Sequence, residues 1–272
     1  MPLAVCATPI GNLEDVTLRV LAELREADVV LCEDTRHTGV LLDRYEIGAG
    51  RRLLSYHEHN EAARTEELLP RLAAGERIAL VSDAGLPGVN DPGGRLVSAA
   101  LERGIPVTVL PGPSAVETAL VASGLAGDQY RFLGYLPRRE AERAALWAEL
   151  RGWQHPAVGF ESPKRLPASL RSLADALPDR RVAVCRELTK RFEEVARGTA
   201  EAVAASFAEA PKGEITLVID GAPAGSDGRA ELAEAVAAVR ELVAAGVPRR
   251  RAVDIVSSLG GLPRNALYRA SL

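Results

Sequence analysis

The run Ser82-Asp83-Ala84-Gly85-Leu86-Pro87-Gly88-Val89-Asn90-Asp91-Pro92-Gly93-Gly94 decides the fold. It holds four glycines, two prolines and two aspartates in thirteen residues, and it continues directly from an apolar run at 78–82. Such a short apolar run predicts a strand that is buried on both faces of a parallel sheet, and ligands bind beyond the carboxyl ends of such strands. Glycine allows close approach of the backbone to a ligand, and proline fixes the path of the loop. Residues 82–94 are therefore the first candidate for a ligand-binding loop.

The rest of the chain shows strand and helix patterns in two successive blocks and a tail. The first block has further strand patterns at 3–8, 28–32 and 106–110, and helix patterns at 17–26, 62–74 and 94–103. The second block has strand patterns at 130–135, 156–160, 181–186 and 214–219, and helix patterns at 139–150, 164–176 and 200–209. After the Gly- and Pro-containing segment 221–228, helices are predicted at 230–245, at 248–258 and from Pro263 to the end. We expect an α/β fold with domains at 1–122 and 123–222, and a linker with a basic, helix-turn-helix-like tail at 223–272.

Length and composition exclude several classes of protein. The 272 residues are 47 % apolar and 26 % charged, which is enough for a sizeable buried core. The chain begins without a signal-peptide pattern, and no run reaches the ~18 apolar residues of a membrane span. Three cysteines without a Cys-x-x-Cys pair, together with four histidines, disfavour a disulfide scaffold or a metal site. We expect a cytoplasmic protein with no membrane partner and no metal.

The charge is divided unevenly along the chain. Residues 1–130 carry a net charge of −8, residues 131–200 carry +5 and residues 201–272 carry −1. The positive middle segment fits a polyanionic partner, although a merely uneven surface is an equal alternative. In the tail, Arg249, Arg250 and Arg251 are candidate contacts to nucleic acid, and a tail that packs on its own domain is the alternative.

The ends of the first-block strands indicate which ligands are suitable. The segment Thr8-Pro9-Ile10-Gly11-Asn12-Leu13 lacks the Gly-x-Gly-x-x-Gly spacing, and the chain has no P-loop, so nicotinamide, flavin and P-loop enzymes are disfavoured. The carboxylates of 82–94 argue against a phosphate, whereas Asp83 suits a ribose hydroxyl, an amine or a sulfonium. The segment Pro111-Gly112-Pro113-Ser114-Ala115 begins a helix that Ser114 can cap, which forms a second wall for the same ligand.

Two further segments of the first block are rich in polar residues, one directly after the strand pattern at 28–32 and one in a later turn. The segment Cys32-Glu33-Asp34-Thr35-Arg36 and the segment His57-Glu58-His59-Asn60-Glu61 predict a rim that faces a substrate. His57 and His59 are spaced to share one face of a strand, but no third ligand accompanies them. We therefore expect hydrogen bonding from these histidines rather than metal binding.

Taken together, these segments resemble a known family. The chain is similar along its whole length, and in the same order, to the bacterial 16S rRNA cytidine-2′-O-methyltransferases of the tetrapyrrole (corrin/porphyrin) methylase superfamily. The strings that carry the resemblance are Thr-Pro-Ile-Gly-Asn-Leu at 8–13, Cys-Glu-Asp-Thr-Arg at 32–36, His-Glu-His-Asn-Glu at 57–61, Ser-Asp-Ala-Gly-x-Pro at 82–87, Pro-Gly-Pro-Ser-Ala at 111–115, Glu-Ser-Pro at 161–163, Glu-Leu-Thr-Lys-x-x-Glu-Glu at 187–194 and Lys-Gly-Glu at 212–214. Two positions depart from the family pattern, because Lys164 replaces a histidine and Asn90 replaces a serine.

The resemblance implies a class III methyltransferase fold, in which two α/β domains hold S-adenosylmethionine between them. It implies that the enzyme methylates the ribose of a cytidine in the decoding region of 16S rRNA, with the 30S subunit as partner and a homodimer as its assembly. The implied cofactor contacts are Pro9, Ile10, Asp83, Ala84, Gly85, Leu86, Ser114, Ala115, Phe160 and Thr216.

Lysine usage singles out the candidate catalytic group. Of the 33 basic residues only Lys164, Lys190 and Lys212 are lysines, and all three lie in motifs of the second block. Only an amine, not a guanidinium, exchanges its proton near neutral pH. We expect Lys190, poised by Glu187 or Glu194, to take or relay the proton of the ribose hydroxyl, with a surface ion-pair cluster as the alternative.

Further residues are expected to bind RNA, either at phosphates or beside the acceptor. They are Asn12, Glu33, Asp34, Arg36, His57, Arg138, Arg139, Lys164 and Arg165, in addition to the three tail arginines. Two other functions are compatible with the same residues. One is a tetrapyrrole C-methyltransferase, and the other is a non-catalytic ribosome assembly factor that binds RNA.

Overall fold

A five-stranded parallel sheet forms the first half of the chain. The structure is a computed structural model that describes residues 2–48, 52–223, 226–260 and 264–272. The strand order is β3-β2-β4-β1-β5, and every pair in this sheet is parallel. The strands are β1 (Leu3–Cys6), β2 (Val29–Cys32), β3 (Leu53–Ser55), β4 (Ile78–Val81) and β5 (Val107–Leu110).

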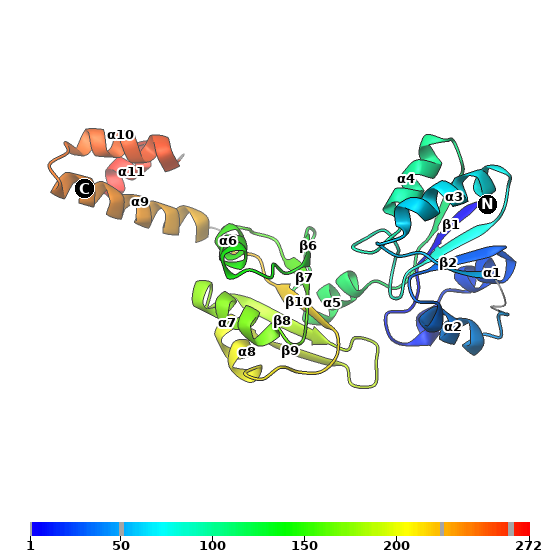
Figure 1. The fold of residues 1–272 in the computed structure, drawn as a ribbon. Coiled ribbons are helices and arrows are strands. Elements are labelled where there is room, and N and C mark those ends of the chain that lie inside the picture. The colour runs from blue at the N-terminus through cyan, green and yellow to red at the C-terminus, as the bar shows by residue number, and fades with distance from the viewer. Residues whose placement is uncertain (1, 49–51, 224–225, 261–263) are drawn as a thin grey trace.

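Helices cover both faces of this sheet, as Figure 1 shows. They are α1 (Leu18–Glu26), α2 (Thr35–Arg44), α3 (Glu61–Ala73) and α4 (Gly94–Glu102). Because successive side chains of a strand point to opposite faces, Ala4 and Cys6 pack in the core under α1 and α2, whereas Leu3 and Val5 pack in the core under α3 and α4. Burial on both faces explains why β1, β2 and β4 read as uninterrupted apolar runs.

The second half contains a mixed sheet with the order β6-β7-β10-β8-β9. Only β6 and β7 are parallel, and the other pairs are antiparallel. The strands are β6 (Arg131–Tyr135), β7 (Ala157–Glu161), β8 (Arg181–Arg186), β9 (Glu194–Thr199) and β10 (Ile215–Ile219).

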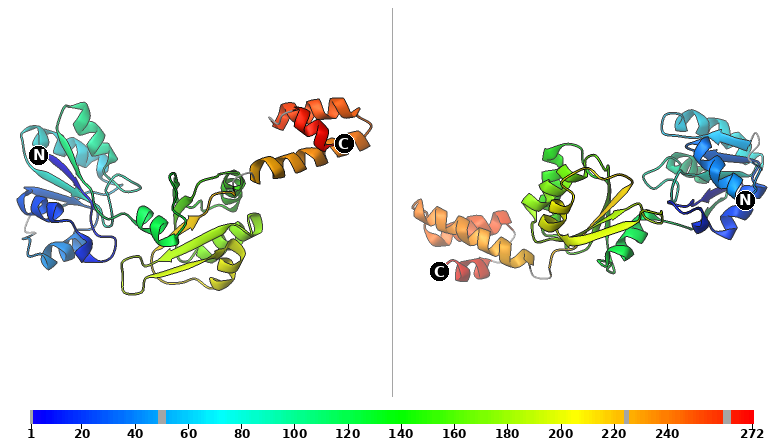
Figure 2. Two further views of the ribbon diagram at one scale, coloured as in Figure 1. Left: turned by 180° about the vertical axis from the view of Figure 1, so that it is seen from behind. Right: turned by 90° about the horizontal axis from the view of Figure 1, so that it is seen from below.

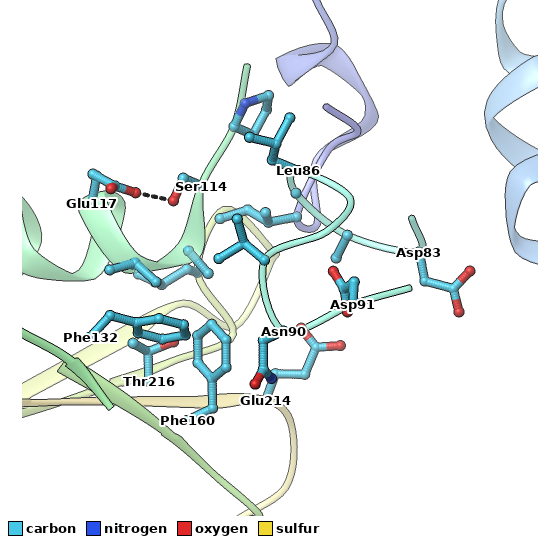
Figure 3. Close-up of a pocket in the computed structure, with 18 of the residues that line it drawn as sticks. Asp83, Leu86, Asn90, Asp91, Ser114, Glu117, Phe132, Phe160, Glu214 and Thr216 are labelled. Atoms are coloured by element: carbon cyan, nitrogen blue, oxygen red, sulfur yellow. Dashed lines mark hydrogen bonds between the residues drawn. The ribbon is translucent and has the colours of Figure 1, made fainter. Parts of the chain in front are cut away.

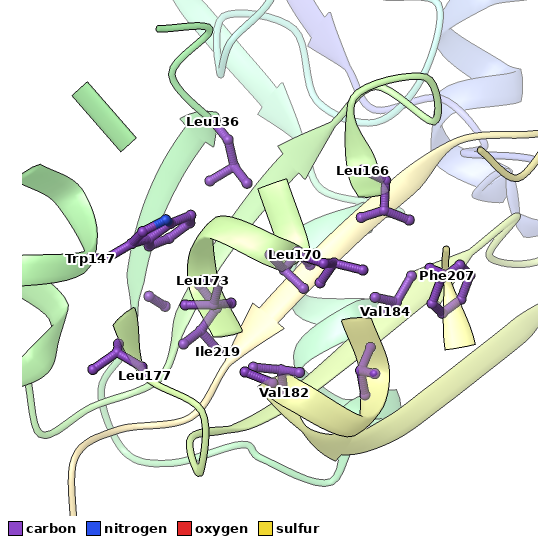
Figure 4. Close-up of a cluster of buried hydrophobic side chains, with 14 of the residues drawn as sticks. Leu136, Trp147, Leu166, Leu170, Leu173, Leu177, Val182, Val184, Phe207 and Ile219 are labelled. Carbon is purple, nitrogen blue, oxygen red and sulfur yellow. The ribbon is translucent and has the colours of Figure 1, made fainter. Parts of the chain in front are cut away.

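One face of the mixed sheet packs against three helices (Figure 4). These are α6 (Glu140–Arg151), α7 (Leu166–Ala176) and α8 (Ala200–Ser206), and Trp147 of α6 lies fully buried among them. Along β10, Ile215, Leu217 and Ile219 face this core, while Val218 faces the opposite side. The opposite side is covered by α5 (Ala115–Ser123), which follows β5 of the first sheet.

Helix α5 joins the two halves. It packs on the second sheet although it leaves the end of the first, and its Val116, Ala119 and Leu120 share an apolar cluster with Ile10 of the first half. In Figures 1 and 2 it lies at the junction of the two lobes. The expected domain boundary at residue 122 falls within this helix.

Three helices form the C-terminal tail, as predicted. They are α9 (Ser226–Ala244), α10 (Arg249–Gly260) and α11 (Arg264–Ala270), and α9 begins inside the segment expected to be a linker. The tail has its own apolar cluster, which includes Val239, Val253 and Leu267. It extends from the side of the second lobe that faces away from the first (Figure 2). Pro263, expected to start the last helix, lies outside the described residues.

Several elements differ from the sequence-based expectation. The pattern analysis missed β3, β9 and α2. Strand β3 has three half-buried residues, and β9 is an edge strand whose side chains are exposed or half-buried, so neither carries a buried apolar run. The cysteines Cys6, Cys32 and Cys185 are unpaired and buried. Among the described residues, no helix has the length and apolar character needed to cross a membrane, and no cluster of His, Cys, Asp and Glu suits a metal.

A buried carboxylate limits substitution at Arg165. The Glu161 side chain is fully buried, pairs with Arg165 and accepts a hydrogen bond from Ser169. Removing one partner of a buried pair leaves an uncompensated charge, so Arg165→Met should lower the unfolding free energy of the second lobe by on the order of 3 kcal/mol. Urea unfolding followed by fluorescence measures this, because both tryptophans, Trp147 and Trp153, lie in that lobe.

A matched control is Arg139→Met. Arg139 is 84 % exposed and pairs with the exposed Glu142, and such surface pairs contribute about 0–1 kcal/mol. Equal losses for the two variants would contradict the assignment of Arg165 to the buried pair.

Candidate functional site

A cleft of about 980 Å³ lies between the two lobes. The first lobe contributes Ile10, the loop that follows β4, and the segment from Pro111 to Glu117. The second lobe contributes the aromatic residues of β6 and β7 and the start of β10. In Figure 3, Asn90 and Asp91 of the loop lie on the side of Phe160, and the Asp83 side chain points away from the aromatic residues. The structure thus brings most of the expected cofactor contacts together, except Pro9, which lines an adjoining pocket.

Hydrogen bonds join the first loop of the chain to the glycine-rich loop. Thr8 N–H donates to Gly85 O at 2.8 Å, Gly85 N–H donates to Thr8 O at 3.1 Å, and the Thr8 hydroxyl donates to Ser82 O at 3.0 Å. Gly85 has φ +81°, and a Cβ there would lie 3.7 Å from Pro113 O. A glycine is favoured at this position because the backbone is left-handed where the loops after β4 and β5 converge.

A carboxylate from α3 holds the far end of the glycine-rich loop. Glu61 Oε1 accepts hydrogen bonds from the backbone N–H groups of Gly93 and Arg95, at 3.1 and 3.3 Å, and from the Tyr56 hydroxyl at 3.2 Å. Tyr56 is almost completely buried, and burial raises its pKa to about 12. From the sequence, Glu61 was expected only to be part of a polar rim, because no nearby residue indicates that its side chain reaches the start of α4.

Glu33, Asp83 and Asp91 form an acidic wall on the first-lobe side of the cleft. Glu117 also lines the cleft, but its carboxylate accepts hydrogen bonds from the Ser114 and Tyr130 hydroxyls. Burial, together with the charges of Glu33 and Asp83, raises the pKa of Asp91 to about 6. Burial and Asp83 likewise raise the pKa of Glu33. Carboxylates that repel one another in a partly desolvated wall are stabilised by a cation, so this wall suits a positively charged ligand.

Aromatic rings form the opposite wall. Phe160 contacts Phe132 and Tyr135 edge to face, at centroid separations of 5.2 and 5.6 Å. This wall offers a flat apolar surface for a ring system such as adenine. Ser114 lies at the mouth, but its hydroxyl bonds the Glu117 carboxylate and no helix amide, so the predicted capping role was wrong.

The turn between β8 and β9 crosses to the first lobe. Asn12 N–H donates to Thr189 Oγ1 at 2.9 Å, and Glu187 and Thr189 have φ of 53° and 64°. These strained conformations persist only where the surroundings impose them. A Cβ on Gly11 would lie 2.5 Å from Lys190 Cγ and 2.9 Å from Leu188 O, so the two lobes meet here with no room for a side chain.

Lys190 lies in this turn between two carboxylates. Its Nζ is 3.1 Å from Glu187 Oε1 and 3.0 Å from Glu214 Oε2. Burial lowers the lysine pKa, but the hydrogen bonds to Glu214 and Glu187 outweigh it and raise the pKa above its usual value. Glu194 instead pairs with Arg186 at 2.8 Å. The structure therefore brings Glu187 to Lys190 as expected, and adds Glu214 of the Lys-Gly-Glu string, whose contact was not predicted.

Several expected RNA contacts have partners within the protein. Arg36 pairs with Asp34 at 2.7 Å, and Arg165 pairs with Glu161. The ring of His57 contacts Asn60 at 3.3 Å. Glu33, Arg138, Lys164, Arg250 and Arg251 are exposed, Arg139 pairs with Glu142, Arg249 is half-buried, and Asn12 caps a short 3₁₀ helix at Leu13–Asp15. Helix α10, which begins with the three tail arginines, lies on the side of the second lobe away from the first lobe (Figure 1).

The fold and the interlobe cleft define a methylase class. Residues 2–204 match the family model of tetrapyrrole (corrin/porphyrin) methylases. The crystal structure of uroporphyrin-III-C-methyltransferase from Thermus thermophilus is 23 % identical, with a TM-score of 0.57 over 80 % of this chain and 93 % of that one. A second structure of that methyltransferase, complexed with S-adenosylhomocysteine, has a TM-score of 0.53 at 20 % identity over 79 % of this chain and 96 % of that one. These structures share the fold.

Curated relatives narrow the assignment. "Ribosomal RNA small subunit methyltransferase I" of Mesorhizobium japonicum is 44 % identical over 99 % of this chain and 91 % of its own length. The protein of the same name from Thermotoga maritima is 44 % identical over 98 % of its own length but 80 % of this chain. The chain therefore belongs to the ribosomal RNA small subunit methyltransferase I family of tetrapyrrole methylases. The resemblance found in the sequence is confirmed.

A methyl group at Gly11 should separate methyl transfer from donor binding. In Gly11→Ala the new Cβ meets the backbone oxygen of Leu188 at 2.9 Å, so the turn that carries Lys190 must shift. Because a misplacement of about 1 Å at a reacting centre costs on the order of 10²-fold, methyl transfer should fall by that order. Calorimetry should show affinity for S-adenosylmethionine within about threefold of the original, since the loop after β4 and the aromatic wall keep their positions. A variant with unchanged transfer would show that this close contact has no role in the reaction.

Proposed function

We propose that this ribosomal RNA methyltransferase transfers the methyl group of S-adenosylmethionine to the ribose 2′-hydroxyl of a cytidine in the decoding region of 16S rRNA. The observation that carries the proposal is the position of Lys190, at the contact between the lobes and beside the cleft with its acidic and aromatic walls. We further propose that the substrate is the 30S subunit and that the enzyme acts as a cytoplasmic homodimer.

The residues of the cleft fit S-adenosylmethionine. Its adenine suits the Phe132, Tyr135 and Phe160 wall, and its sulfonium suits the wall of Glu33, Asp83 and Asp91. S-Adenosylmethionine supplies an electrophilic methyl group on a positively charged sulfur. The backbone of the loop at Asp83, Ala84, Gly85 and Leu86, with Ile10, Ser114, Ala115 and Thr216, would complete the site.

The acidic wall distinguishes the donor from the product. Methyl transfer removes the charge from sulfur, so the attraction to the three carboxylates ends with the reaction. This difference favours binding of the charged donor and release of the neutral product, and it depends on the carboxylates being ionised.

Donor affinity should therefore depend on pH through Asp91. Its pKa of about 6 means that the side chain is charged above pH 6 and neutral below it. Lowering the pH from 7.5 to 5.5 reduces the ionised fraction of Asp91 from nearly all to about one quarter, so it should weaken S-adenosylmethionine binding by roughly three- to fourfold. The affinity for S-adenosylhomocysteine, which has the same amino acid end but no sulfonium, should change much less over this pH range. Calorimetry with both ligands measures the difference between their pH dependences, and Asp91→Asn should abolish this difference. Parallel pH profiles for the two ligands would contradict the role of the acidic wall.

Lys190 is proposed to relay the proton of the acceptor hydroxyl. Its raised pKa keeps it protonated at neutral pH, so it accepts the hydroxyl proton only as it passes one of its own to Glu214 or Glu187. In the balanced step, the ribose oxygen forms a bond to the methyl carbon as the bond between that carbon and sulfur breaks. The hydroxyl proton passes to Lys190 while a proton of Lys190 passes to Glu214 or Glu187, so one carboxylate ends protonated. The ammonium also stabilises the negative charge that develops on the oxygen.

Lys190→Arg tests the relay. A guanidinium keeps the charge but does not exchange protons near neutral pH, so single-turnover methylation should fall by roughly 10²–10⁴-fold, the usual contribution of proton transfer. The same exchange at the exposed Lys212, which has no proposed role, is the control and should leave the rate unchanged. Full activity of Lys190→Arg would exclude the relay.

Exposed basic residues are proposed to bind RNA phosphates. They are Arg138, Arg139 and Lys164 of the second lobe and Arg250 and Arg251 of the tail, together with the half-buried Arg249. Deleting residues 226–272 should weaken binding to 30S subunits and reduce its salt dependence, by about 0.7 in the log–log slope for each lost contact to single-stranded RNA. Filter binding at several salt concentrations measures both. Unchanged affinity and slope would show that the tail does not contact RNA.

One assay separates the proposed function from its alternatives. Radiolabelled S-adenosylmethionine is incubated with the protein and with 30S subunits, naked 16S rRNA or a corrin precursor, and labelled RNA is digested to nucleosides. The proposal expects label in 2′-O-methylcytidine from 30S subunits. Label on the corrin precursor supports a tetrapyrrole methylase, label on a base excludes ribose methylation, and RNA binding without label supports an assembly factor.

A further inference from the structure

A second pocket, of about 430 Å³, adjoins the donor cleft. The two share Ile10, Asp83, Ala84 and Glu214 as walls. Helix α2 contributes His37, Thr38, Val40 and Leu41 to the rest of the wall, which the loop after β1, Ser82 and Lys190 complete. None of the four α2 residues has a role in the proposed function.

The position of Lys190 indicates which of the two pockets takes the acceptor and which takes the methyl donor. Lys190 lines the second pocket and not the donor cleft. In a displacement reaction the acceptor oxygen must approach within about 3 Å of the methyl carbon, so the acceptor must occupy a space that shares walls with the donor cleft. Among the described residues, the pocket beside α2 satisfies this condition and also contains the group proposed to handle the acceptor proton.

The lining of the second pocket suits a single nucleoside. Leu13, Val40 and Leu41 give an apolar surface for the face of a base, while His37, Thr38 and Lys190 supply polar groups. The volume is at the small end of the roughly 300–1,000 Å³ range of ligand sites, which fits one nucleoside better than a macrocycle of four rings. Val40 is 60 % exposed, so its side chain is free to contact a ligand in this pocket.

We propose that the pocket between α2 and the Lys190 turn receives the acceptor nucleotide, turned out of the RNA so that its base lies against Leu13 and Val40 and hydrogen-bonds His37. The inference rests on the proposed function, because it places the substrate of that reaction. Enzymes that modify nucleotides commonly extrude the target from its stack into such a pocket. It also predicts that α2 contributes to the choice of nucleotide.

The test is to fill the pocket without disturbing the core. Val40→Trp puts a large ring at an exposed position of α2, and Leu101→Trp puts the same ring at a 58 % exposed position of α4, outside both pockets. For Val40→Trp we expect S-adenosylhomocysteine binding within twofold of the original protein, by calorimetry, and at least a tenfold loss of methyl transfer from radiolabelled S-adenosylmethionine to 30S subunits. Leu101→Trp should leave both unchanged.

A second variant tests the polar contact. His37→Ala removes an exposed side chain, so it should preserve S-adenosylhomocysteine binding and raise the KM for 30S subunits by three- to tenfold, with a smaller change in kcat.

Transfer by Val40→Trp at the original rate, or loss of S-adenosylhomocysteine binding by that variant, would overturn the assignment of this pocket to the acceptor. If the original protein methylates no rRNA, the proposed function fails and this inference with it; if it does and Val40→Trp does equally, only the inference fails.

Discussion

The apolar cluster that α5 shares with both lobes is the constraint on which the site depends. Ile10 of the first lobe, Leu120 of α5, and Cys185 and Val218 of the second sheet are packed in one buried group. Separating the lobes would expose Ile10 and the apolar side chains that it covers, at a cost of about 25 cal/mol for each Å² of apolar surface. The contact between Asn12 and Thr189 adds a directional bond at the other side of the cleft. The width of the cleft is therefore set by packing as well as by covalent connection.

How much of the fold the sequence reveals depends on burial. The strands of the first sheet that are buried on both faces, such as β1 and β4, are evident as apolar runs. The edge strand β9 has only exposed and half-buried residues and was missed. The loop at 82–94 was found because its glycines and prolines are local signals. The contact of Glu61 with the start of α4 was not, since residues 32 positions apart meet only in the folded protein.

For the charged residues of the candidate site, the sequence likewise shows which groups are present but not which of them pair. Glu194 lies four residues after Lys190 and was expected beside it, but the pairing of β8 with β9 places it opposite Arg186. Glu214, 24 residues away in sequence, takes that place because β10 lies next to β8. Likewise, Arg36 and Arg165 read as free cations in the sequence but are neutralised by Asp34 and Glu161 in the fold. Sequence identifies which ionisable groups are present, and strand pairing determines which of them are partners.

The burial of all three cysteines has a practical consequence for labelling. Burial raises the pKa of Cys6 to about 12 and of Cys185 to about 11, and it also raises that of Cys32. Thiolate is the reactive form, so maleimides and iodoacetamides should find almost no target in the native protein. One cysteine introduced on the tail and one on α4 would then accept a pair of fluorophores, and energy transfer between them would report the distance between these parts without removal of any natural thiol.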